Sequence, residues 1–343
     1  MKHRRILSGL AALMLAASLS MSALARERDI ADGDITIVAD NDGQKVSQGT
    51  ENDISDDNPI IIGNSATNTV SIVAEKDQTA SVTLSGANID GSTKGNAAVS
   101  TTGEGNVSIE LDGDNTLKSG KGHAGLEKKN GGKLTIADED KNGKLTAEGG
   151  KYGAGIGGGD QGAGSGITIT GGEIKATGGQ YGAGIGGGKG AGSDITISGG
   201  EVNASGGVNG AGIGGGLRSK GKDITVSGDT KLKVQGGDED HYDGAGAGIG
   251  DGGSNAYGSQ IPGAEVEPDT SGLTTGRIEY YAPGADMDKD APSQTIVGTY
   301  IPPQPAREAA APAQPAAPLY RVTDGDGKDV RYETTWRDGV LTL

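Results

Sequence analysis

Hydrophobic and polar residues alternate in short runs through most of this chain, and glycine or serine follows many of the runs. The segments 166–170 (GITIT) and 173–177 (EIKAT) are typical, because an aliphatic residue stands at every second position. A period of two predicts β-strands that bury one face, and the spacing of an amphipathic helix is absent. Glycine within the runs would also destabilise a helix. We therefore predict an all-β fold.

A longer repeat groups these runs into units. The segment GAGIGGG occurs at Gly153–Gly159, Gly182–Gly188 and Gly210–Gly216, at spacings of 29 and 28 residues, and a shortened copy, GAGIG, occurs at Gly246–Gly250. Each unit contains three strand-like runs separated by glycine turns. A fixed period in this range is typical of a solenoid. The predicted fold is a right-handed parallel β-helix (β-solenoid) of about six or seven turns over residues 60–255.

Superposing the units predicts which side chains stack in the core. Aliphatic residues recur at equivalent positions, so each should lie on its counterpart in the next turn. The predicted columns are Ile167, Ile195 and Ile224; Ile169, Ile197 and Val226; Ile174, Val202 and Leu232; Ile156, Ile185, Ile213 and Ile249; and Ala154, Ala183, Ala211 and Ala247. A β-propeller is the main alternative fold, but its blades take about 40 or more residues and carry signatures that this chain lacks.

The segments outside the repeats differ in composition. Residues 1–25 combine a basic start, an apolar run and the pattern Ala-Leu-Ala, which together predict a secretory signal peptide. Residues 26–59 are expected to form an N-terminal cap and residues 256–300 a C-terminal cap. Residues 301–318 are rich in proline and alanine and predict a stiff linker. Residues 319–343 alternate again and predict a short β-meander, which is either truncated or docked on the cap.

Composition and charge limit the classes of partner and the cellular location that we expect for this chain. Cysteine is absent, so the exported chain must be stable without disulfides and has no site for a lipid anchor. The formal net charge is −16, and removing the signal peptide takes away three basic residues to leave −19. Such acidity disfavours nucleic acid and anionic membranes, and an acidic polysaccharide would need a bridging divalent cation. No later run suits a transmembrane helix. The mature chain is therefore expected to be secreted, either released or held non-covalently at the cell surface.

Three residues beside the GAGIGGG segments are candidates for sugar binding. Tyr152 and Tyr181 occupy equivalent positions one turn apart, and Asn209 follows in the next turn. Exposed tyrosines in line can stack on sugar rings, although a structural role at the rim explains them equally well. The glycine segments also have two explanations. Either the backbone requires glycine at each turn, or a bare strip lets a polymer or a second solenoid approach closely.

The main candidate for a metal site is the acidic insertion that lengthens the last repeat. It carries Asp238, Asp240 and Asp243, whose carboxylates would suit calcium. A hydrated acidic loop is the alternative, because the spacing matches no calcium-binding motif. Weaker clusters occur at residues 112–114 and 138–140. No other cofactor is expected.

No catalytic constellation is evident in the sequence. The lyases and glycosidases that share this fold need a base near bound calcium or a pair of spaced carboxylates. Arg218 is the only arginine between residues 35 and 260, and no carboxylate pair recurs beside aromatic residues. His123 and His241 lie far apart and share no partner pattern. We therefore expect a protein that is not an enzyme.

The segment Val107–Gly120 (VSIELDGDNTLKSG), followed by the GAGIGGG repeats, resembles the secreted "carbohydrate-binding" β-helix proteins of clostridial-type gut bacteria. The resemblance covers roughly residues 30–300. It implies a parallel β-helix at the cell surface that binds polysaccharide, in some members with calcium, and it assigns no ligand residue to this chain.

The expected function is therefore non-catalytic binding of a polysaccharide or cell-surface glycan. Two alternatives stay open: a structural adhesin or spacer without a small-molecule site, and a polysaccharide lyase or hydrolase.

Overall fold

A computed structural model describes residues 25–256, 258–298, 335–337 and 340–342. The chain forms two units, residues 1–300 and residues 301–343. The predicted signal peptide and the Pro/Ala-rich linker lie outside the described residues. No helix in the described part is long and apolar enough to cross a membrane.

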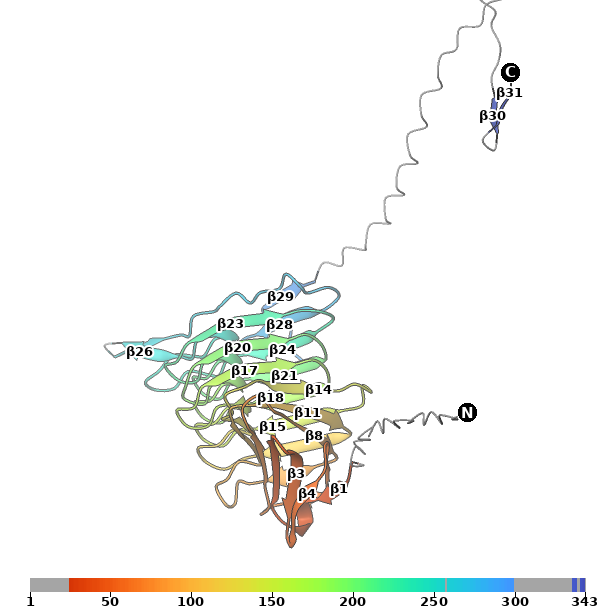
Figure 1. Cartoon of the computed structure of the whole chain (residues 1–343). Helices are drawn as coiled ribbons and strands as arrows, with labels where there is room; N and C mark the ends of the chain where they lie inside the picture. Colours follow the sequence, from red (N-terminus) through yellow and green to blue (C-terminus); the bar gives the residue numbers. More distant parts are fainter. Residues whose placement is uncertain (1–24, 257, 299–334, 338–339, 343) are drawn as a thin grey trace, which may run out of the picture. The chain divides into compact units, whose positions relative to one another are not determined.

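The first unit is a parallel β-solenoid built from three long sheets (Figure 1). Sheet 1 contains, in order, β1 (Glu27–Asp29), β5 (Ile60–Ile62), β8 (Thr79–Ser85), β11 (Asn106–Asp112), β14 (Leu134–Ala137), β17 (Gly164–Ile169), β20 (Gly192–Ile197) and β23 (Gly221–Val226). Sheet 2 contains β4 (Glu51–Ser55), β3 (Gly43–Gln48), β2 (Ile35–Asp40), β7 (Val70–Ala74), β10 (Val99–Gly103), β13 (Leu126–Lys128), β16 (Ile156–Gly157), β19 (Ile185–Gly186), β22 (Ile213–Gly214) and β25 (Ile249–Gly250). Sheet 3 contains β6 (Asn64–Ser65), β9 (Asn88–Asp90), β12 (Asp114–Lys118), β15 (Lys144–Glu148), β18 (Glu173–Thr177), β21 (Glu201–Ser205), β24 (Lys231–Gln235), β28 (Arg277–Tyr281) and β29 (Gln294–Val297).

Each complete turn of the solenoid takes one strand from each sheet, in the order sheet 2, sheet 1, sheet 3. Six such turns run from β7 to β24, and strands of incomplete turns flank them at both ends. The prediction of a parallel β-helix of about six or seven turns is confirmed. The parallel stack also extends beyond the predicted 60–255 range, because β2 pairs in parallel with β7 and β28 pairs in parallel with β24.

The core lies between the three sheets and follows the predicted columns. Ile167 pairs with Ile195, and Ile195 pairs in turn with Ile224, all in parallel register. The other aliphatic columns also pair in register, and their side chains are buried. Along β8 and β11 buried residues alternate with partly exposed ones, as the period of two requires. The alternation of hydrophobic and polar residues therefore determines which side chains form the core.

The glycine segments are buried, so a bare exposed strip does not exist here. Gly157 has a φ of +135°, and a Cβ at this position would lie 2.0 Å from the carbonyl oxygen of Gly186 in the next turn. The chain beyond the strand folds back closely, since a Cβ at Gly158 would lie 2.2 Å from the carbonyl oxygen of Gly162. Close approach between turns and positive φ thus explain the glycines. Of the two explanations, the structure supports the backbone requirement for glycine, and these segments offer no bare strip to a polymer or a second solenoid.

Antiparallel strands end the parallel stack. At the N-terminal end, β3 pairs antiparallel with β2, and β4 pairs antiparallel with β3. The buried side chain of Gln44 links the N-terminal strands to the stack. Its amide donates to the carbonyl oxygens of Asp56 and Ser81 at 2.9 and 2.8 Å. At the other end β29 pairs antiparallel with β28. The short helix η1 (Ile30–Asp32) and the hairpin of β26 (Ser254–Ala256) and β27 (Ser259–Ile261) complete the first unit.

In the second unit the structure describes one antiparallel pair, β30 (Thr335–Arg337) and β31 (Val340–Thr342). This pair lies within the predicted β-meander of residues 319–343.

Candidate functional site

The two tyrosines predicted to contact sugar lie next to each other on one corner of the solenoid. Tyr152 lies in the loop between β15 and β16, and Tyr181 lies in the equivalent loop one turn later. Backbone hydrogen bonds fix both loops, since the NH of Tyr152 donates to Gln180 and the NH of Tyr181 donates to Val208, at 2.8 and 3.0 Å. Both tyrosines have positive φ, 78° and 77°, so the same backbone conformation directs both side chains.

The two rings form a stacked pair. Their centroids lie 5.7 Å apart and their planes differ by 9°, and both side chains are partly exposed. Burial raises the pKa of Tyr181, and the nearby charge of Asp240 raises it further, so its hydroxyl stays protonated at neutral pH. The pair therefore offers partly exposed aromatic surface beside a hydroxyl that lies 3.5 Å from Asp240 Oδ2, and the aromatic surface suits contact with sugar rings.

Three lysines surround the Tyr152 ring. The Nζ atoms of Lys121, Lys151 and Lys189 lie 5.8, 5.0 and 5.1 Å from the ring centroid, within the range of cation–π contacts. The three lysines come from three successive turns, and the solenoid brings them together. We call the two tyrosines and these three lysines the tyrosine–lysine corner. Sequence reasoning missed the lysines, although the 30-residue spacing of Lys121 and Lys151 matches the repeat.

Asn209, the third predicted sugar-binding residue, is fully buried. Its side-chain amide donates to the carbonyl oxygens of Asp243 and Gly244 at 3.0 and 2.9 Å. The insertion that lengthens the last repeat supplies both acceptors and covers this residue. Asn209 is therefore structural, and the prediction that it contacts sugar is wrong.

The predicted calcium ligands of the insertion do not gather around a common point. Asp238 is exposed, whereas Asp243 is buried and accepts from Arg218 Nε and Nη2 at 2.7 and 2.9 Å. Asp240 accepts from the backbone NH groups of Asp243 and Tyr242, which lower its pKa. Arg218 thus neutralises one carboxylate and backbone donors hold another. The structure does not support a calcium site at Asp238, Asp240 and Asp243.

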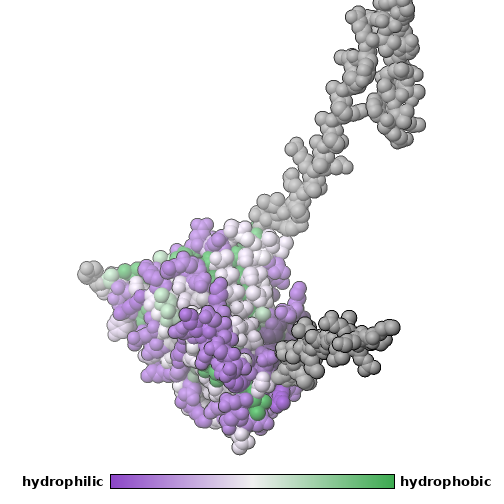
Figure 2. Space-filling model, in the orientation of Figure 1, coloured by the Kyte–Doolittle hydropathy of each residue, from purple (hydrophilic) through white to green (hydrophobic). Residues whose placement is uncertain are grey.

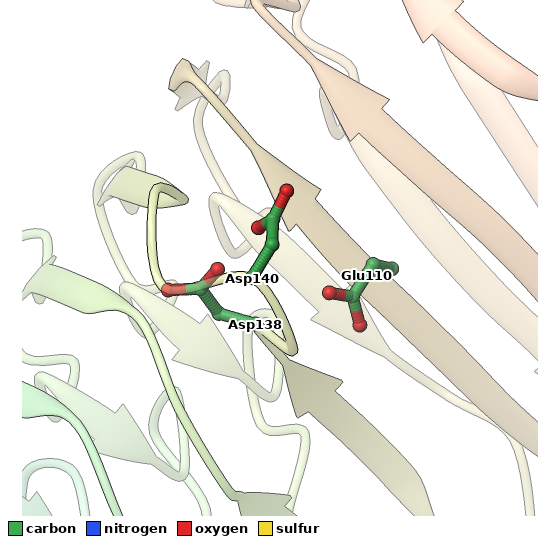
Figure 3. Close-up of side chains that lie close together, drawn as sticks. All are labelled: Glu110, Asp138 and Asp140. Atoms are coloured by element: carbon green, nitrogen blue, oxygen red, sulfur yellow. The ribbon is translucent and has the colours of Figure 1, made fainter.

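A different carboxylate cluster could hold a hard cation. Carboxylate oxygens of Glu110, Asp138 and Asp140 lie within 4.8 Å of one another, with Glu110 on β11 and the aspartates in the loop after β14 (Figure 3). Glu110 also accepts from the backbone NH of Glu139 at 2.6 Å. The sequence pattern indicated the 138–140 cluster only as a weaker site, and it gave no sign of Glu110, which lies one turn earlier.

Replacing Glu110 with glutamine tests this cluster. Burial and the surrounding carboxylates raise the pKa of Glu110 above its ordinary value of 4.5. The folded chain then holds this proton where the unfolded chain has lost it, so wild-type stability falls as pH rises through and above pH 4.5. We expect Glu110→Gln to leave Tm unchanged near pH 4 and to raise it at pH 7. Calcium should raise the Tm of the wild type at pH 7 more than that of the variant. Equal responses of both proteins would contradict a role for Glu110.

A histidine–glutamate pair lies beside the tyrosine–lysine corner. His123 Nδ1 lies 2.6 Å from Glu127 Oε2, and Lys129 Nζ lies 3.0 Å from Glu127 Oε1. The Glu127 side chain is only 2% exposed, whereas that of His123 is 30% exposed. The buried carboxylate therefore orients an accessible imidazole. This pair could not be predicted from the sequence, because a spacing of four residues indicates contact in a helix and not in a β-structure.

A hollow of about 520 Å³ follows another corner of the solenoid, between sheets 1 and 3. Its charged side chains pair with each other across turns, as in Lys144–Glu173 at 3.2 Å and Lys231–Glu201 at 3.7 Å. Among the described residues that line it none is aromatic. The tyrosine–lysine corner is therefore the better candidate for ligand binding.

Three segments of the chain match the family model described as "Beta helix repeat": residues 141–160, 167–189 and 195–217. The chain contains β-helix repeats. No curated protein and no solved structure matches it. The matched β-helix repeats include both tyrosines of the corner and end before the acidic insertion.

Proposed function

We propose that the mature chain is a secreted or cell-surface β-solenoid that binds polysaccharide without cleaving it. The stacked, partly exposed pair of Tyr152 and Tyr181 carries the proposal, because paired aromatic rings beside hydrogen-bond donors suit sugar recognition. The predicted signal peptide supports export, and the resemblance to secreted carbohydrate-binding β-helix proteins supports the ligand class.

The surface otherwise offers little for an apolar partner. On the face shown in Figure 2 hydrophilic residues predominate, and hydrophobic areas are small. In the described part, the exposed large hydrophobic residues are Tyr242, Ile261 and Val297. A docking surface for an apolar protein face is therefore a weaker interpretation than a polar glycan site.

Replacing the tyrosines tests the proposal. We expect Tyr152→Ala and Tyr181→Ala each to weaken polysaccharide binding at least tenfold in isothermal titration, because the ring contact is lost. Tyr242→Ala is the matched control, since Tyr242 is 68% exposed and lies outside the corner, and it should bind like the wild type. Wild-type affinity in both corner variants would refute the site.

A panel of polysaccharides separates this function from its alternatives. The mature protein is incubated with each polymer, with calcium or with chelator, and both pull-down and release of reducing ends are measured. Binding without cleavage supports the proposal, and cleavage overturns it. If the protein binds none of the polymers, a structural adhesin or spacer is favoured.

The second candidate is a lyase at the same corner, and the His123–Glu127 pair favours it. An imidazole held by a buried carboxylate can take the proton from the ring carbon that bears a sugar carboxylate. The C–H electron pair then forms a C=C bond as the adjacent C–O bond to the leaving sugar breaks, and water protonates the leaving oxygen. Release of unsaturated chain ends by the wild type, and its loss in His123→Ala, would establish this activity.

A further inference from the structure

Three lysines of the tyrosine–lysine corner keep their charge free. In the part of the chain that the structure describes, Lys121, Lys151 and Lys189 form no salt bridge, although their Nζ atoms approach one ring. Lys121 and Lys151 lie on adjacent turns, because the NH of Gly122 donates to the carbonyl oxygen of Lys151 at 2.8 Å. The fold thus holds three like charges together, and among the described residues no carboxylate lies within 4.0 Å of their Nζ atoms.

The neighbouring carboxylate is already neutralised by other groups. Glu127 accepts from His123 and from Lys129, so it does not pair with the three corner lysines. The lysines of the hollow between sheets 1 and 3 differ in this respect, because Lys144 and Lys231 pair with glutamates there. Free positive charge therefore distinguishes the corner from the hollow.

Two carboxylates limit where an anion can lie. The NH of Asp160 donates to the carbonyl oxygen of Gly122 at 2.8 Å, so Asp160 lies beside the loop that carries Lys121. On the other side, the Tyr181 hydroxyl lies 3.5 Å from Asp240 Oδ2. Three lysines against one aspartate leave the Tyr152 side positive, whereas the Tyr181 side faces acid.

The high acidity of the whole chain does not cancel this local charge. At physiological salt, interactions between exposed charges are largely screened beyond about 8 Å. The three ammonium groups lie within 5.8 Å of the ring centroid, so they dominate the field felt by a ligand on that ring. The expectation from net charge, that an acidic polysaccharide needs a bridging cation, therefore does not apply at the corner.

We infer that the tyrosine–lysine corner binds an acidic polysaccharide, with a sulfate or carboxylate group of the ligand among Lys121, Lys151 and Lys189 and a sugar ring against the tyrosine pair. This inference rests on the proposed function and narrows its ligand to anionic glycans. Direct contact with ammonium groups makes binding independent of calcium.

The test compares two triple variants of the mature protein. Lys121→Gln, Lys151→Gln and Lys189→Gln together remove the corner charge, and Lys76→Gln, Lys94→Gln and Lys175→Gln remove the same charge from exposed lysines elsewhere. Both are titrated in chelator with dextran sulfate, polygalacturonate and neutral dextran, alongside a panel of neutral polysaccharides. The first two polymers distinguish sulfate from carboxylate, and the unsulfated dextran is a matched control for the sulfated one.

We expect the corner triple variant to bind the acidic polymer at least tenfold more weakly than the wild type, equivalent to about 1.4 kcal/mol. The control triple variant should stay within twofold, and Asp160→Asn should bind more tightly. Equal losses in both triple variants, or binding that requires calcium, would overturn the inference. Binding of neutral polymers alone would overturn the inference and keep the proposed function, whereas failure of every polymer to bind would overturn both.

Discussion

Replacing Gly186 with alanine is expected to lower the free energy of unfolding by about 3–5 kcal/mol. Gly186 has a φ of +132°, and a Cβ there would lie 2.1 Å from the carbonyl oxygen of Gly214 in the next turn. Two costs add together: the strained backbone and the forced separation of two turns. Because each turn contacts mainly its neighbours, the loss of stability should be greatest around β19. Urea denaturation followed by circular dichroism measures the change in the free energy of unfolding, and hydrogen exchange shows which turns lose protection.

Gly95→Ala is the matched control for this variant. Gly95 also has a positive φ, +72°, but a Cβ there would meet no atom within 4 Å. Only the conformational cost applies, so the expected loss is about 1 kcal/mol. Similar losses in the two variants would show that close packing between turns contributes little at Gly186.

The second large effect is expected from Ile169→Ala, which should lower the free energy of unfolding by about 2–5 kcal/mol. Ile169 is fully buried and lies in register between Ile136 and Ile197. Removing its outer carbons loses apolar burial and leaves a cavity between two turns that the stacked strands cannot close. The measurement is again urea denaturation.

Thr168→Ala provides the comparison in the same strand. Thr168 points away from the core and is partly exposed, so the expected change is within about 0.5 kcal/mol. A loss at Thr168 as large as that at Ile169 would contradict the assignment of the inner face.

The fold could be predicted from the sequence because one rule acts at every turn. Alternation assigned Ile167 and Ile169 to the core, and the 28- to 29-residue spacing placed them on Ile195 and Ile197. Each strand interacts with its equivalents in the neighbouring turns, so the repeat encodes the long-range contacts too. The burial of the glycine segments could not be predicted in this way, because the loop that follows each segment folds back onto it.

The corner depends on contacts that the repeat does not specify. Lys189 reaches Tyr152 because its loop packs against the tyrosine loop of the preceding turn, where a Cβ at Gly188 would lie 2.6 Å from the carbonyl oxygen of Tyr152. Asn209 occupies the tyrosine position but is covered by an insertion that only the last repeat contains. Comparison of equivalent positions in the repeats therefore predicted the tyrosine pair. It was wrong for Asn209, because a longer loop covers that position.

The antiparallel strands at the two ends of the solenoid stop the parallel stack whatever the number of turns between them. β3 and β4 at one end and β29 at the other stop the parallel register, and neither contacts the middle turns through backbone pairing. Duplication of the 29-residue unit that carries Tyr152 would therefore leave both ends intact while adding a third tyrosine to the stacked pair. The aromatic surface available to a repeating polymer would then lengthen in steps of one turn, and avidity would change in the same steps.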